Sequence, residues 1–67
     1  MEVQTRDLSG ATVNHETVDA AFKAAEKRNS DIWKVSWTVA ETGERVRFIR
    51  VSKNPPEWKY APMKEKS

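Results

Sequence analysis

Residues 31–51, DIWKVSWTVAETGERVRFIRV, contain the pattern that decides the fold. Apolar and polar side chains alternate over residues 33–39, and β-branched and aromatic residues fill the apolar positions. This period of two is typical of a half-buried strand. Glu41-Thr42-Gly43 then predicts a three-residue hairpin loop whose glycine is in the left-handed region. Residues 44–51 form the returning strand, which ends before Asn54-Pro55-Pro56 because proline cannot donate to a strand ladder.

The register of this hairpin determines which side chains share a face. A three-residue loop places Trp37 opposite Arg47 and Val35 opposite Ile49. One face then carries Trp33, Val35, Trp37, Val39, Ile49 and Val51, with Arg45 and Arg47 near the hairpin tip. The other face carries Ile32, Lys34, Ser36, Thr38, Val46, Phe48 and Arg50. The alternative is a two-residue turn at Thr42-Gly43, which would put Val46 and Phe48 beside the tryptophans and Arg45, Arg47, Ile49 and Val51 outside. We prefer the three-residue loop, which exposes Phe48.

A helix is predicted from about His15 to Arg28. Asn14 is a favoured N-cap, and an apolar stripe recurs at helical spacing after it, formed by Val18, Ala21, Phe22 and Ala25. Residues 2–8 alternate enough to suggest a further strand. The element order is therefore β-α-β-β.

This order predicts the α+β class, with one helix packed on a three-stranded, mainly antiparallel sheet in two layers. We expect residues 1–56 to form a single small domain and residues 57–67 to form a C-terminal arm or tail, partly disordered. The expected core consists of Val18, Phe22, Trp33, Val35, Trp37, Ile49 and Val51.

Several function classes are excluded at this stage. The chain has no cysteine, and His15 is its only histidine, so no residues have the spacing of a metal site or of a cysteine or serine nucleophile with its base. Two glycines far apart in the chain cannot form a phosphate-binding glycine loop. We therefore expect no enzyme, no catalytic residue, no metal, no cofactor and no small-molecule substrate.

The location of the protein is predicted from its apolar runs. No run approaches the roughly 20 residues that span a bilayer. Acidic residues stand in the N-terminal stretch, where a signal peptide would be basic and then apolar. These features predict a cytoplasmic protein that does not enter a membrane.

Charge is distributed unevenly along the chain. Residues 32–67 hold eight basic and four acidic side chains, whereas residues 1–31 hold four basic and six acidic ones. Arg45, Arg47, Arg50 and Lys53 fall within nine positions that contain no acid. Such a basic hairpin attracts an anionic partner. In the preferred register, Lys34 also lies opposite Arg50, a like-charge pair that lowers stability without structural gain and so suggests a function.

Aromatic residues extend the candidate site. Phe48 sits between the hairpin arginines and, if exposed, could stack a base. Trp58 either covers one end of the core or belongs to an amphipathic arm, and the sequence leaves both open. The predicted binding residues are Lys34, Arg45, Arg47, Phe48, Arg50, Lys53 and Trp58.

Two functions fit this pattern. The first is a small non-catalytic binding module whose basic β-hairpin contacts an anionic macromolecule, with nucleic acid as the leading partner. The alternative is a regulator or inhibitor that covers an acidic surface of a larger protein. In size and architecture the chain is similar to small bacteriophage proteins that bind and inhibit host enzymes, although no motif carries that likeness. The oligomeric state stays open.

Overall fold

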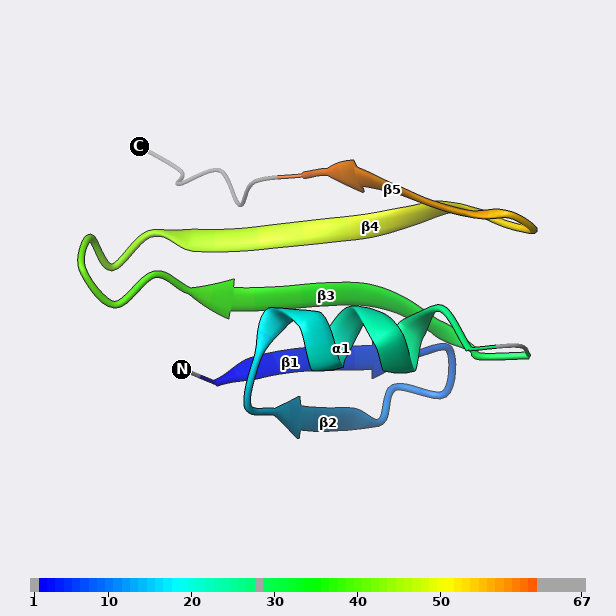
Figure 1. The fold of residues 1–67 in the computed structure, drawn as a ribbon, viewed down its shortest axis with the longest axis horizontal. Helices are drawn as coiled ribbons and strands as arrows, with labels where there is room; N and C mark the ends of the chain where they lie inside the picture. Colours follow the sequence, from blue (N-terminus) through cyan, green and yellow to red (C-terminus); the bar gives the residue numbers. More distant parts are fainter. Residues whose placement is uncertain (1, 28, 62–67) are drawn as a thin grey trace.

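The computed structural model describes residues 2–27 and 29–61. They form a five-stranded antiparallel sheet with a helix on one face (Figure 1). The elements are β1 (Val3–Asp7), β2 (Thr12–His15), α1 (Val18–Ala25), β3 (Ile32–Thr38), β4 (Arg45–Lys53) and β5 (Pro56–Tyr60). The strand order in the sheet is β2-β1-β3-β4-β5. The α+β class is confirmed, but the sheet has five strands instead of the predicted three.

The first additional strand, β2, replaces the predicted beginning of the helix. The Asp7 carboxylate accepts hydrogen bonds from the backbone N–H groups of Ser9 and Ala11, both at 3.0 Å, and from the Ser9 hydroxyl at 2.7 Å. This tight turn returns the chain along β1. The helix therefore begins at Val18, and its N-cap is Thr17, whose Oγ1 accepts from the Ala20 N–H at 3.0 Å. The predicted cap at Asn14 is wrong because that residue lies in β2.

The second additional strand, β5, falls in the region where an arm or tail was expected. After the turn at Asn54 and Pro55, the chain runs back along β4, with Tyr60 opposite Phe48 and Lys59 opposite Ile49. The part of the predicted tail from Pro62 onward lies outside the described residues. The hydrogen-bonded sheet thus continues to Tyr60, beyond the domain boundary drawn at residue 56.

Val39 and Glu44 close the turn between β3 and β4, so four residues, 40–43, lie inside the turn, one more than predicted. The Val39 N–H donates to the Glu44 carbonyl at 2.8 Å, and the Gly43 N–H donates to the Val39 carbonyl at 2.7 Å. Gly43 has φ +73°, as expected for a left-handed glycine. Because a one-residue slip reverses every side chain of a strand, the preferred register is wrong. Phe48 lies opposite Val35, the face that the alternative turn had predicted.

The core lies between α1 and the sheet. Its buried residues are Val3, Ala21, Ala25 and Val35, and the partly buried residues packed against them are Val18, Phe22, Ile32, Trp37 and Trp58. Three predicted core residues are absent from this cluster. The β4 register moves Ile49 to the other face, and Val51 is 59% exposed. The third, Trp33, lies at a bulge in the β1–β3 pairing, and Ile32 takes the core position instead.

The helix covers only part of its side of the sheet. It packs against β1, β2 and β3, while β4 and β5 extend beyond it (Figure 1). Aromatic rings cover this remainder: the Phe48 ring centroid lies 5.7 Å from Phe22, 5.8 Å from Trp37 and 5.5 Å from Tyr60. Within the described ranges, no helix has the length and apolar character needed to cross a membrane.

Candidate functional site

The sheet face opposite α1, here called the open face, carries a group of basic side chains. Residues directly opposite one another in a ladder project to the same face. Arg6 pairs with Lys34, Lys34 with Ile49, and Ile49 with Lys59. Arg47 and Arg45 project to this face as well, because they alternate with the core-facing residues of β4. We call these five cations the cationic face: Arg6, Lys34, Arg45, Arg47 and Lys59.

Lys34 lies at the centre of this group. Partial burial lowers the pKa of its ammonium group, and the positive charges of Arg6, Arg47 and Arg45 lower it further. The ion pairs among the described residues are Lys23 with Asp19 and Lys53 with Asp31, and both lie elsewhere. No described carboxylate lies within 4.0 Å of a nitrogen of the cationic face. The face therefore concentrates positive charge without a compensating acid in that range.

Neutral groups hold the two arginines of β4 in place. The Arg45 side chain extends from β4 across β3 to β1. Its Nη1 donates to Thr38 Oγ1 at 2.9 Å, and its Nη2 donates to Gln4 Oε1 at 3.3 Å. Arg47 donates through Nε to the Ala61 carbonyl at 2.9 Å. Among the described residues, its two terminal NH₂ groups have no hydrogen-bond partner. Neutral acceptors orient both guanidinium groups without cancelling their charge.

A small hollow of about 30 Å³ lies beside Lys34 on the same face. Its lining is entirely polar: Gln4, Thr5, Arg6, Thr12, Lys34 and Ser36. A hollow of this size admits a small polar group, such as one oxygen of an anion. Hydroxyl, amide and cationic groups around so small a space suit an oxyanion group better than an apolar one.

Trp33 adds an aromatic ring to the cationic face. Its Nε1 donates to the Asp7 carbonyl at 3.0 Å, and the Lys34 ammonium lies 5.7 Å from its ring centroid. The side chain is half-buried and is not among those packed against the core. Because of the bulge in the β1–β3 pairing, Trp33 is not a core residue as predicted. Its ring is held by a hydrogen bond and lies next to Lys34.

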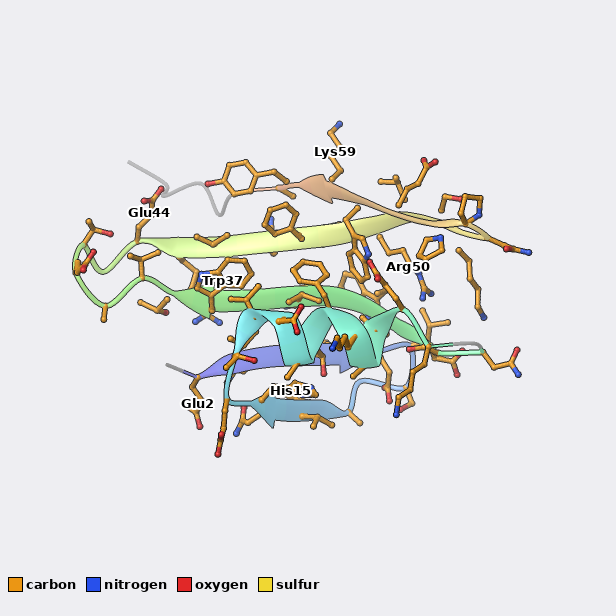
Figure 2. The ribbon with its side chains drawn as sticks, in the orientation of Figure 1. Glu2, His15, Trp37, Glu44, Arg50 and Lys59 are labelled. Carbon is orange, nitrogen blue, oxygen red and sulfur yellow. The ribbon has the colours of Figure 1, made fainter. Side chains whose placement is uncertain are left out.

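The other predicted binding residues lie elsewhere. Phe48 is half-buried and packs against aromatic rings on the helix side, so the prediction that it is an exposed stacking residue on the basic face is wrong. Arg50 reaches from β4 toward the end of α1, where Nη1 donates to the Ser30 carbonyl at 3.1 Å (Figure 2). Trp58 packs against the core, and its Nε1 donates to Glu26 Oε2 at 3.2 Å. Lys53 ends β4 and pairs with Asp31 at 3.8 Å.

A larger groove of about 560 Å³ lies on the helix side, between the end of α1 and the β4–β5 turn. Its lining has mixed charge: Ala25, Glu26, Lys27, Asn29, Arg50, Lys53, Asn54 and Pro56. Its charges partly cancel, since Lys53 pairs with Asp31 and the Glu26 carboxylate lies in the same lining as the cations. Despite its size, this groove offers fewer free groups of one charge than the cationic face.

Sequence reasoning missed three residues of the open face. Alternation along β1 puts Arg6 on the same face as Gln4. The sequence does not show that β1 lies beside β3, which is what places Arg6 next to Lys34. Lys59 projects at the β5 edge of the sheet (Figure 2). The alternation of Trp58, Lys59 and Tyr60 after a proline turn was an available signal for it. Trp33 reaches the open face through a bulge, which has no clear signal in this sequence.

Comparisons with known proteins leave the candidate site to be judged on its geometry. No family model matches the chain, and no curated protein or solved structure shows significant similarity to it. In the part of the chain that the structure describes, no group of three or more His, Cys, Asp or Glu side chains could hold a metal ion.

Proposed function

We propose that this domain is a non-catalytic binding module whose cationic face binds nucleic acid. The observation that carries the proposal is the position of five cations on four neighbouring strands, on the sheet face that no described element covers, without a described carboxylate within 4.0 Å. Phosphates neutralised by lysine and arginine release condensed counterions, and this release drives nucleic-acid binding.

The chemistry of the face favours phosphate over an acidic protein surface. Protein interfaces gain most of their energy from buried aromatic and arginine anchors at their centre. Here a cluster of aromatic rings, Phe22, Trp37, Phe48 and Tyr60, packs on the helix side, and Trp33 is the ring that lies beside the cations. The Thr12 hydroxyl and the Gln4 amide stand beside the cations instead. Such groups are common donors to phosphate oxygens.

Titration with labelled oligonucleotides tests the proposal. The wild-type protein should bind at low salt, and its affinity should fall linearly with the logarithm of salt concentration. Arg6→Gln should weaken binding and reduce the slope by about 0.7 to 0.9, the contribution of one phosphate contact. Lys23→Gln is the matched control, because it removes the same charge from α1 and should leave affinity and slope nearly unchanged.

Two results would contradict the proposal. One is the absence of binding to any DNA or RNA oligonucleotide at micromolar protein and low salt. The other is an equal loss of affinity in Arg6→Gln and Lys23→Gln, since this would mean that net charge alone attracts the oligonucleotide. A protein partner that stays bound after nuclease treatment, and is lost with Arg6→Gln, would favour the regulator of an acidic protein.

A further inference from the structure

The width of the cationic face limits the form of nucleic acid that it can bind. Neighbouring strands are about 4.8 Å apart, so Arg6 on β1 and Lys59 on β5 are separated by about 14 Å at their backbones. The major groove of B-form DNA is about 12 Å wide and admits a helix or a two-stranded ribbon. A five-stranded sheet lying flat cannot enter it. A single strand, in contrast, can lie along the face and bring successive phosphates to successive cations.

Trp33 supplies the second feature that a single strand needs. Unpaired bases have free π-faces and stack on aromatic side chains, whereas the bases of a duplex are stacked on each other. The hydrogen bond from Nε1 to the Asp7 carbonyl holds the indole in place before any ligand arrives. A ring held in this way loses little conformational freedom on binding.

The Trp33 ring and the polar hollow lie side by side. Lys34 connects the two features. Its ammonium lies 5.7 Å from the Trp33 ring centroid, and it lines the hollow together with Arg6. A nucleotide carries a flat base and an anionic phosphate a short distance apart. The open face thus presents one stacking surface and one oxyanion site at neighbouring positions.

We infer that the cationic face binds single-stranded nucleic acid, with the indole of Trp33 stacking on one base and Arg6 and Lys34 holding a phosphate. This inference rests on the proposed function and names its ligand. The width of the face keeps the sheet out of a duplex groove, and the half-buried Trp33 ring adds a stacking interaction that a closed duplex cannot use.

The test compares labelled oligothymidine, oligouridine and a matched DNA duplex. Wild-type protein should bind both single strands more tightly than the duplex. Trp33→Leu should weaken single-strand binding by about 5- to 150-fold, the range for loss of one stacked base. Its salt slope should stay unchanged, because stacking releases no counterions. Trp33→Tyr keeps a ring and should retain most of the affinity. Tyr60→Leu removes a 46% exposed ring from the other face and is the matched control.

A measurement on the wild-type protein covers the case in which Trp33→Leu does not fold. The chain has three tryptophans, and only the indole N–H resonance of Trp33 should move strongly when oligothymidine is added, whereas those of Trp37 and Trp58 should stay in place. Equal affinity for duplex and single strands, or equal effects of Trp33→Leu and Tyr60→Leu, would overturn the inference and leave the proposed function standing. Failure of every oligonucleotide to bind at low salt would overturn both.

Discussion

At the scale of single residues, the Arg6–Lys34 pair is the feature that folding alone does not explain. The two cations lie directly opposite each other on β1 and β3, and like charges in this position destabilise a sheet. The folded-state pKa of Lys34 is lowered below its ordinary value of 10.5 by burial first and then by Arg6, Arg47 and Arg45. The folded protein therefore holds a proton on Lys34 less readily than the unfolded chain. Near neutral pH, the charged lysine opposes folding.

This pair leads to a prediction about stability. Arg6→Gln should raise the free energy of unfolding by about 0.2–1 kcal/mol at low salt, the range for a cross-strand pair, and should raise the pKa of Lys34. The gain should shrink as pH rises through the folded pKa of Lys34 toward 10.5, because the lysine then loses its charge. Urea denaturation at several pH values measures the stability, and NMR titration of the lysine measures the pKa.

The control variant should change the free energy of unfolding in the opposite direction. Lys23→Gln removes an exposed i,i+4 pair with Asp19 and should lower stability slightly. A similar loss of stability in Arg6→Gln would show that Arg6 stabilises the fold and that the pair is not under repulsion. Together with the binding test above, the expected result is a variant that folds more stably and binds more weakly. That combination is typical of residues kept for function.

The sequence anticipated part of this feature. The preferred register placed Lys34 opposite Arg50, within residues 45–53, which contain four basic residues and no acid. The predicted partner was wrong: Arg50 lies on the helix side, and the residue opposite Lys34 is Arg6, 28 positions earlier in the chain than Lys34. Residue chemistry was predictable, whereas the pairing depended on a strand order that no local pattern encodes.

At the scale of elements, the β1–β2 turn shows how one side chain can redirect the chain. Residues 12–18 satisfy the sequence rules for a helix start, with an N-cap residue at Asn14 and apolar neighbours. The carboxylate of Asp7 nevertheless collects three hydrogen bonds and closes a tight turn just before them. The hydroxyl of Ser9 first and the N–H of Ala11 next lower the pKa of Asp7 below 3.8. The short turn brings Thr12–His15 back along β1 as a strand.

The second prediction concerns this turn and its pH dependence. The folded pKa of Asp7 is depressed, so its stabilising effect is fully present above 3.8 and is lost as pH falls from there through the folded pKa. Asp7→Asn weakens the same hydrogen bonds at every pH. It should therefore lower the free energy of unfolding near neutral pH. The difference in this free energy between Asp7→Asn and wild type should become smaller in acid. Hydrogen exchange of the β2 amides at neutral and acid pH measures the effect locally.

The outcome that would contradict this prediction is a constant difference between Asp7→Asn and wild type across the acid range. Ser9→Ala is a useful companion, because it removes the hydroxyl donor and leaves the carboxylate in place. It should raise the Asp7 pKa toward 3.8 and weaken β2 less than Asp7→Asn does.

The elements that were predicted correctly show periodicity in the sequence, which is weaker in β1 than in the others. The strands β1, β3 and β4 have alternating residues, and α1 has a stripe at helical spacing. The hairpin loop was misjudged by one residue, because Gly43 can close a loop of three or four residues with the same left-handed conformation. This single step reversed the faces of β4 and moved Phe48 from the candidate site to the aromatic cluster.

At the scale of the whole molecule, the two faces of the sheet have different roles: one packs against the helix and the other carries the cations. The buried apolar residues are few, namely Val3, Ala21, Ala25 and Val35, and α1 is only eight residues long. The rings around Phe48 cover the part of the sheet that α1 does not reach. No described element covers the open face, which carries the cations. Stability should therefore depend on the helix side and binding on the open side.

Two neighbouring residues of β4 test this division. Phe48 contacts three aromatic rings on the helix side, whereas Ile49 lies between Lys34 and Lys59 on the open face. Each aromatic pair contributes about 0.5–1.5 kcal/mol beyond its buried area. Phe48→Ala should therefore lower the free energy of unfolding by at least about 1.5 kcal/mol more than Ile49→Ala does. Urea denaturation measures both values, and Phe48→Leu serves where the alanine variant is too unstable. Folded Phe48→Leu should bind oligothymidine like wild type, because its side chain does not touch the cationic face. Equal destabilisation by the two alanine variants would mean that the hairpin faces are not as described, and the cations would then lie on the core side of the sheet.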